Sequence, residues 1–144
     1  MPMNTIEFEG KADIIWDRIL ALTSALEVFE PRLKGFQRQI LLVKSGHRFE
    51  TAWLKASEPY LKSEVIKELT TGLNEIAELH FNCDQMDKAK QICQSAYILS
   101  KIVLSDAHPD TIILENNLKL IDQRTRKSKQ SLPRLKSFKK KQKS

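Results

Sequence analysis

Apolar residues recur at intervals of three and four positions through most of residues 11–121, and no stretch alternates as a half-buried strand would. This spacing places the apolar side chains of each run on one face of an amphipathic helix. The runs predict helices over residues 11–30, 31–45, 49–56, 61–80, 86–104 and 109–123. Because the connections are short, neighbouring helices are expected to be antiparallel, and the predicted fold class is all-α.

Proline and glycine mark several of the predicted boundaries. Pro31 can begin the second helix because a first-turn residue needs no N–H partner, and Gly46 is expected to end that helix. Ser57-Glu58-Pro59 is typical of an N-cap and first turn, here of the fourth helix. Thr70-Thr71-Gly72 could break the fourth helix, because β-branched residues and glycine lower helix propensity.

The fourth and fifth predicted helices contain the pattern of a repeat. With Leu73 at the fourth position of a tetratricopeptide unit, Ala77, Ala89 and Ala96 fall at three positions where such a unit has small residues. Small residues at these positions let two helices and the first helix of the next unit approach closely.

Further stretches extend the similarity beyond the small residues. They are Leu73 to His80, Met86-Asp-Lys-Ala89, His108-Pro109-Asp110-Thr111 and Asn116-Asn117-Leu118, and Asn74 and Asn116 are 42 residues apart. Residues 73–121 therefore resemble the tetratricopeptide repeats of kinesin light chains and related adaptors. The resemblance implies a fragment of a right-handed α-solenoid that binds other proteins.

The resemblance also implies a peptide-binding groove along the first helix of each unit. Carried over by position, it assigns to this groove Asn74, Glu78, Phe81, Asn82, Asn116, Leu120 and Gln123. Asparagine side chains in such a groove can hydrogen-bond the main chain of an extended peptide. The alternative is that these are ordinary exposed residues of two helices.

Two positions depart from a regular repeat. Lys119 occupies the eighth position of the last unit, where a close-packed second helix requires a small residue. We therefore expect residues 109–123 to form a polar terminal cap. Upstream, residues 36–43 and 49–56 suit a degenerate unit, except that Gln39 stands where an apolar residue is expected.

The net charge of +6 comes from the C-terminal end. Residues 1–121 have 14 Lys and Arg against 17 Asp and Glu, a net charge of −3, whereas residues 122–144 have 10 against one, a net charge of +9. The predicted organisation is a helical domain over 1–123, with N-terminal helices 11–56, a clear repeat 58–105 and a capping helix 109–123, followed by a basic tail 124–144. The tail is expected to be disordered, because it has few apolar residues and repels itself.

The function hypotheses differ in where binding resides. The candidate binding residues in the tail are eight of its ten basic residues: Arg124, Arg126, Lys127, Lys129, Lys139, Lys140, Lys141 and Lys143. They are compatible with a solvated end, a nuclear-import signal, or a contact with phosphates of nucleic acid or an anionic membrane. The primary hypothesis is an adaptor that binds a protein partner on its concave face. The alternatives are a nucleic-acid-associated protein that binds through its tail, and self-association through a repeat edge.

Motifs of catalysis and metal binding are absent from the sequence. It contains no GxxxxGK[ST], GxGxxG, HExxH or GxSxG pattern. His80 and Cys83 lack the second pair of ligands that a zinc site needs, and Cys93 falls at a core position of the repeat. We expect no enzymatic activity, cofactor or metal. No apolar run reaches the ~20 residues of a membrane span and no secretory signal is visible, so a cytoplasmic or nuclear location is predicted.

Overall fold

The computed structural model describes residues 5–127 and 135–138 of the 144-residue chain. Every regular element in these stretches is helical, which confirms the predicted all-α class. The α-helices are α1 (Thr5–Phe29), α2 (Phe36–Lys44), α3 (Thr51–Ser57), α4 (Ser63–Asn82), α5 (Met86–Val103) and α6 (Pro109–Lys127). Two 3-10 helices, η1 (Pro31–Leu33) and η2 (Glu58–Tyr60), precede α2 and α4.

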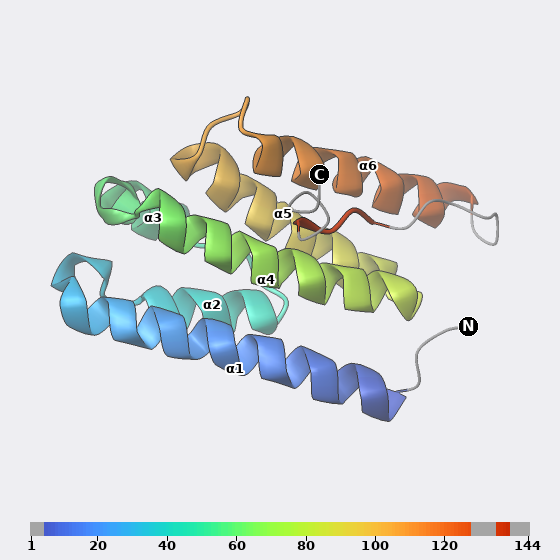
Figure 1. Cartoon of the computed structure of the whole chain (residues 1–144), viewed down its shortest axis with the longest axis horizontal. Coiled ribbons are helices and arrows are strands. Elements are labelled where there is room, and N and C mark those ends of the chain that lie inside the picture. Colours follow the sequence, from blue (N-terminus) through green and yellow to red (C-terminus); the bar gives the residue numbers. More distant parts are fainter. Residues whose placement is uncertain (1–4, 128–134, 139–144) are drawn as a thin grey trace.

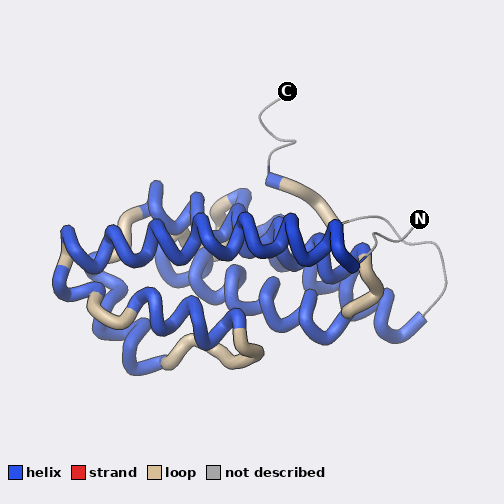
Figure 2. The backbone as a smooth tube through the Cα atoms, turned by 90° about the horizontal axis from the view of Figure 1, so that it is seen from below, coloured by secondary structure: helices blue, strands red, loops and turns tan. Residues whose placement is uncertain are grey.

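The long helices are arranged in two layers (Figure 1). α4 and α5 form a central hairpin; α1 packs against α4, α2 packs against α5, and α6 packs against α5 and α4. As a result α1, α4 and α6 form the front layer in Figure 1, and α2 and α5 lie behind them. The view from below in Figure 2 shows residues 135–138 on the outer face of the front layer.

The hairpin that precedes α4 and α5 is formed by α1 and α2. This differs from the expected pairing of residues 36–43 with 49–56, because α2 instead lies between α1 and α5. Gln91 of α5 fixes the end of α2: its Nε2 donates to the main-chain oxygens of Val43, at 3.1 Å, and His47, at 2.9 Å. α3 is a single short helix of seven residues.

α4 is continuous through Thr70-Thr71-Gly72, where the sequence suggested a break. Thr70 Oγ1 donates to the main-chain oxygen of Ile66 at 2.7 Å, within the helix. Gly72 faces α1, where a Cβ atom added to it would lie 2.9 Å from Cδ1 of Ile19. The glycine therefore serves the close approach of α1 to α4 and does not end the helix.

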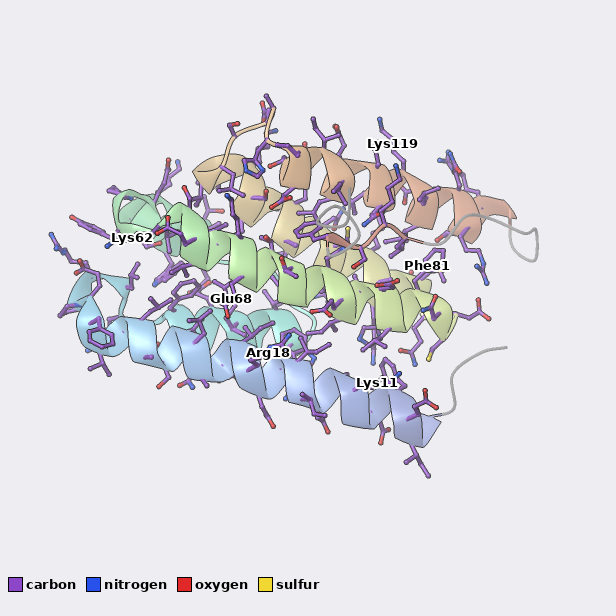
Figure 3. All side chains as sticks on the ribbon, in the orientation of Figure 1. Lys11, Arg18, Lys62, Glu68, Phe81 and Lys119 are labelled. Carbon is purple, nitrogen blue, oxygen red and sulfur yellow. The ribbon has the colours of Figure 1, made fainter. Side chains whose placement is uncertain are left out.

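The repeat positions explain how α4, α5 and α6 pack. Ala77, Ala89 and Ala96 are fully buried, as close approach of these helices requires. Gln39, the residue that did not fit the degenerate unit, is also buried, and its side chain is paired with Glu50. Gln39 Nε2 donates to Glu50 Oε1 at 2.8 Å, and the Glu50 N–H donates to Gln39 Oε1 at 2.8 Å. Lys119 is exposed on the outer side of α6 (Figure 3), where no described helix covers it.

Candidate functional site

A short segment near the C-terminus, Leu135–Phe138, lies between α4 and α6 on the front layer (Figure 1). We call the place it occupies the α4–α6 groove. Leu135 is 2% exposed and Phe138 is 7% exposed, and both belong to the hydrophobic core cluster. Lys136, between them, is exposed. The segment thus presents apolar side chains at its first and fourth positions to the helical body.

Two asparagines, one from each helix, hold the main chain of this segment at Lys136. Asn117 Oδ1 accepts a hydrogen bond from the Lys136 N–H at 3.0 Å. The Lys136 carbonyl oxygen accepts from Asn117 Nδ2 at 3.1 Å and from Asn74 Nδ2 at 2.9 Å. Asn117 Nδ2 also donates to Asn74 Oδ1 at 3.0 Å. We call this pair the asparagine fork; it satisfies the N–H and the C=O of a single residue.

The asparagine fork is buried, so its side-chain nitrogen and oxygen atoms need hydrogen-bond partners. Asn74 is 1% exposed and Asn117 is not exposed. Buried polar atoms without hydrogen bonds are costly, and within the described residues every buried side-chain nitrogen and oxygen has a partner. Part of that satisfaction comes from the Lys136 main chain. The groove is therefore complementary to a peptide main chain at this point.

Of the two asparagines of the fork, Asn74 was among the candidate site residues and Asn117 was not. Asn74, which was assigned to a partner groove by position, contacts Lys136, whereas on α6 the contacting residue is Asn117 and not its neighbour Asn116, which is partly exposed. Asn117 lies between Leu114 and Ile121 on the buried stripe of α6, and Asn116 is turned away from that stripe. A polar residue within an apolar stripe is the sequence signal that could have identified it.

The other predicted groove residues are distributed around the groove. Glu78 and Asn82 line a hollow of about 460 Å³ on the α1 side of α4, together with Lys11, Ile14, Ile15, Glu75 and Leu79. Phe81, labelled in Figure 3, is buried near the end of α4. Leu120 packs against the core and Gln123 is exposed. The structure therefore does not gather the predicted set into one contact surface.

The start of the predicted basic tail is part of the helical body. α6 continues to Lys127, and Arg124 Nη2 contacts Asp84 Oδ1 at 2.7 Å, with the guanidinium 5.2 Å from the centre of the Phe81 ring. This pair joins α6 to the turn between α4 and α5. Within the tail, residues 124–127 belong to α6, and residues 135–138 lie against the helical body; disorder was predicted beyond about residue 127. Lys129, Lys139, Lys140, Lys141 and Lys143 lie outside the described residues.

Burial shifts the pKa of both His80 and Cys93. Burial lowers the pKa of His80, a hydrogen bond to Gln85 at 2.6 Å opposes this effect, and Phe8 packs edge-on at 4.9 Å between ring centres. Burial raises the pKa of the Cys93 thiol to about 12. A nucleophilic cysteine needs a lowered pKa and access to solvent, so this thiol is suited to packing.

Comparison with known proteins identifies no relative: no protein-family model, curated protein or solved structure matches the chain. In the part of the chain that the structure describes, no helix is long and apolar enough to cross a membrane. Within residues 5–127 and 135–138, no three His, Cys, Asp or Glu side chains are grouped so that they could hold a metal ion.

Proposed function

We propose that this chain is a non-enzymatic protein-interaction module of tetratricopeptide type that binds an extended segment of a partner protein in the α4–α6 groove. The observation that carries the proposal is the asparagine fork, with Leu135–Phe138 seated on it. Hydrogen bonds to a main chain give affinity that is independent of side-chain identity, while pockets for particular side chains give specificity. The groove contains both elements, since it binds the Lys136 main chain and buries two apolar side chains.

The helix arrangement supports the tetratricopeptide part of this proposal. α1, α4 and α6 occupy one layer, as the first helices of successive repeat units do, and the segment lies on that layer. The fork joins two of these helices, at residues 74 and 117. An adaptor is the protein class that we propose on this basis.

The proposal can be tested by selecting short random peptides from a display library. The bait is the full-length protein with Leu135→Asp and Phe138→Asp, which removes the apolar side chains that hold the chain's own segment. The same bait with Asn74→Leu and Asn117→Leu should select no specific peptides. Replacing both partners of a buried hydrogen bond with similarly shaped apolar groups largely preserves stability, so this variant should remain folded.

A neighbouring asparagine provides the matched control for this experiment. Asn116→Leu changes the same residue type on the same helix without touching the fork, and its bait should select the same peptides as the parent bait. Circular dichroism verifies that each bait is helical. Equal selection by folded baits with and without the fork would refute the proposal.

The high positive charge of residues 122–144, a net of +9, supports a second candidate, binding of nucleic acid through the tail. Phosphate contacts release counterions, so this binding should weaken by orders of magnitude between about 50 and 200 mM salt. Peptide binding in the groove should change little over that range. A steep salt dependence for a labelled duplex, unaffected by Asn74→Leu and Asn117→Leu, would favour the tail as the functional part.

A further inference from the structure

We propose that the groove recognises extended peptides with apolar side chains at the first and fourth positions, and that Leu135–Phe138 is the chain's own copy of this ligand. The groove is then closed by its own tail until a partner segment of the same chemistry displaces it. This inference rests on the proposed function and adds to it the class of ligand and the way in which access is controlled.

The ligand class follows from which parts of the segment are held. The side chains of Leu135 and Phe138 are buried, three positions apart. At Lys136 the fork contacts only the main chain, and the side chain is exposed. The second position of a ligand therefore tolerates many side chains, but it requires an N–H that can donate to Asn117 Oδ1. Proline at this position would be excluded, because it has no N–H.

The attachment of the segment to the body explains why the chain's own copy can occupy the groove. Seven residues, 128–134, separate the end of α6 from Leu135. A short tether gives the segment an effective concentration at the groove on the order of millimolar. Even a segment with a dissociation constant of about 100 µM would then occupy the groove in roughly ten of every eleven molecules. A free peptide of equal intrinsic affinity then binds about tenfold more weakly than it would to an empty groove.

The experiment measures fluorescence anisotropy of a labelled peptide that copies residues 131–142. It is titrated with the full-length protein and with the full-length variant carrying Leu135→Asp and Phe138→Asp. We expect about tenfold tighter binding to the variant than to the unmodified protein. The control variant, Gln130→Asp with Gln142→Asp, adds the same charge outside the segment and should bind as the unmodified protein does.

Two altered peptides test the ligand class directly. A peptide with an N-methyl group on the Lys136 amide has no donor for the fork and should lose at least tenfold in affinity, since a buried acceptor is left unpaired. A peptide with alanine in place of Lys136 should keep the parent affinity. Sedimentation at micromolar concentration should show a monomer, because a dimer would mean that the segment occupies the groove of a second copy.

Several results would overturn the inference. Equal affinity for the unmodified protein and the Leu135→Asp, Phe138→Asp variant would show that the tail does not close the groove. Full binding of the N-methyl peptide, absence of binding to the folded variant, or a dimer would each contradict a part of it. Selected library peptides that bind through the fork but lack the apolar spacing would overturn this inference alone, whereas a failure of the fork itself would overturn the proposed function as well.

Discussion

The asparagine fork predicts a specific response to the substitution Asn117→Asp. The two side chains have nearly the same shape, but at pH 7 the carboxylate has no N–H to donate. The Nδ2 bonds to Asn74 Oδ1 at 3.0 Å and to the Lys136 oxygen at 3.1 Å are replaced by contacts between acceptors. A buried and unpaired charge costs about 3–5 kcal/mol if the structure stays closed around it.

Release of Leu135–Phe138 from the groove costs less free energy than keeping the charged carboxylate buried. Burial of Leu135 and Phe138 contributes about 1.5–3 kcal/mol each, and the three bonds to the Lys136 main chain contribute about 1 kcal/mol each. Ordering the main chain of these four residues costs about 1–2 kcal/mol each. At the midpoints of these ranges, docking gains about 1–2 kcal/mol. Asn117→Asp should lower the free energy of unfolding by this amount, because release exposes the carboxylate to water.

Urea unfolding followed by circular dichroism measures this loss, and hydrogen exchange at the Lys136 amide reports whether the segment is docked. That amide should be protected in the unmodified protein and unprotected in the variant. Asn116→Asp adds the same charge one residue away and should keep both stability and protection. The reasoning is refuted if Asn117→Asp retains a protected Lys136 amide, or if it loses about 4 kcal/mol, the cost expected when the charge stays buried.

Three further predictions concern the helical body. Gly72→Ala should destabilise it by about 1 kcal/mol in urea unfolding, because crowding at α1 (about 1–3 kcal/mol) exceeds the gain in helix propensity (about 1 kcal/mol). Gly10→Ala is the control: a Cβ atom there would have no neighbour within 4 Å, so this substitution should stabilise α1. Equal effects of the two substitutions would contradict the packing argument. A thiol reagent at pH 8 should modify the partly exposed Cys83 in the native protein and Cys93 only after unfolding, because burial raises the pKa of Cys93 to about 12. Mass spectrometry of peptides distinguishes the two modified cysteines. Modification of Cys93 in the native protein would be inconsistent with its burial. Burial lowers the pKa of His80 below 6.5, so the unfolded state takes up a proton at a higher pH than the native state does. The free energy of unfolding should therefore fall as the pH is lowered through 6.5 towards the lower native pKa. An NMR titration that gives a native pKa at or above 6.5 would rule this out.

Local spacing was sufficient to predict much of this protein. The intervals of three and four residues gave the helices, since each helix is a local structure whose apolar face can be read from neighbouring positions. The small residues at 77, 89 and 96 indicated close packing between helices, and they are buried. Lys119 indicated an uncovered outer side of α6, because a long charged side chain does not fit a close helix contact.

Long-range contacts determined what the spacing left open. Gly72 is compatible with a helix break or with a close contact, and only the position of Ile19 on α1 distinguishes them. The choice of Asn117 over Asn116 depends on the rotation of α6 against α4, which one residue of helix changes by about 100°. The docking of Leu135–Phe138 was hidden by the surrounding charge: composition averages over the tail, whereas two apolar side chains and one main-chain amide are enough to bind once α4 and α6 present a groove that fits them.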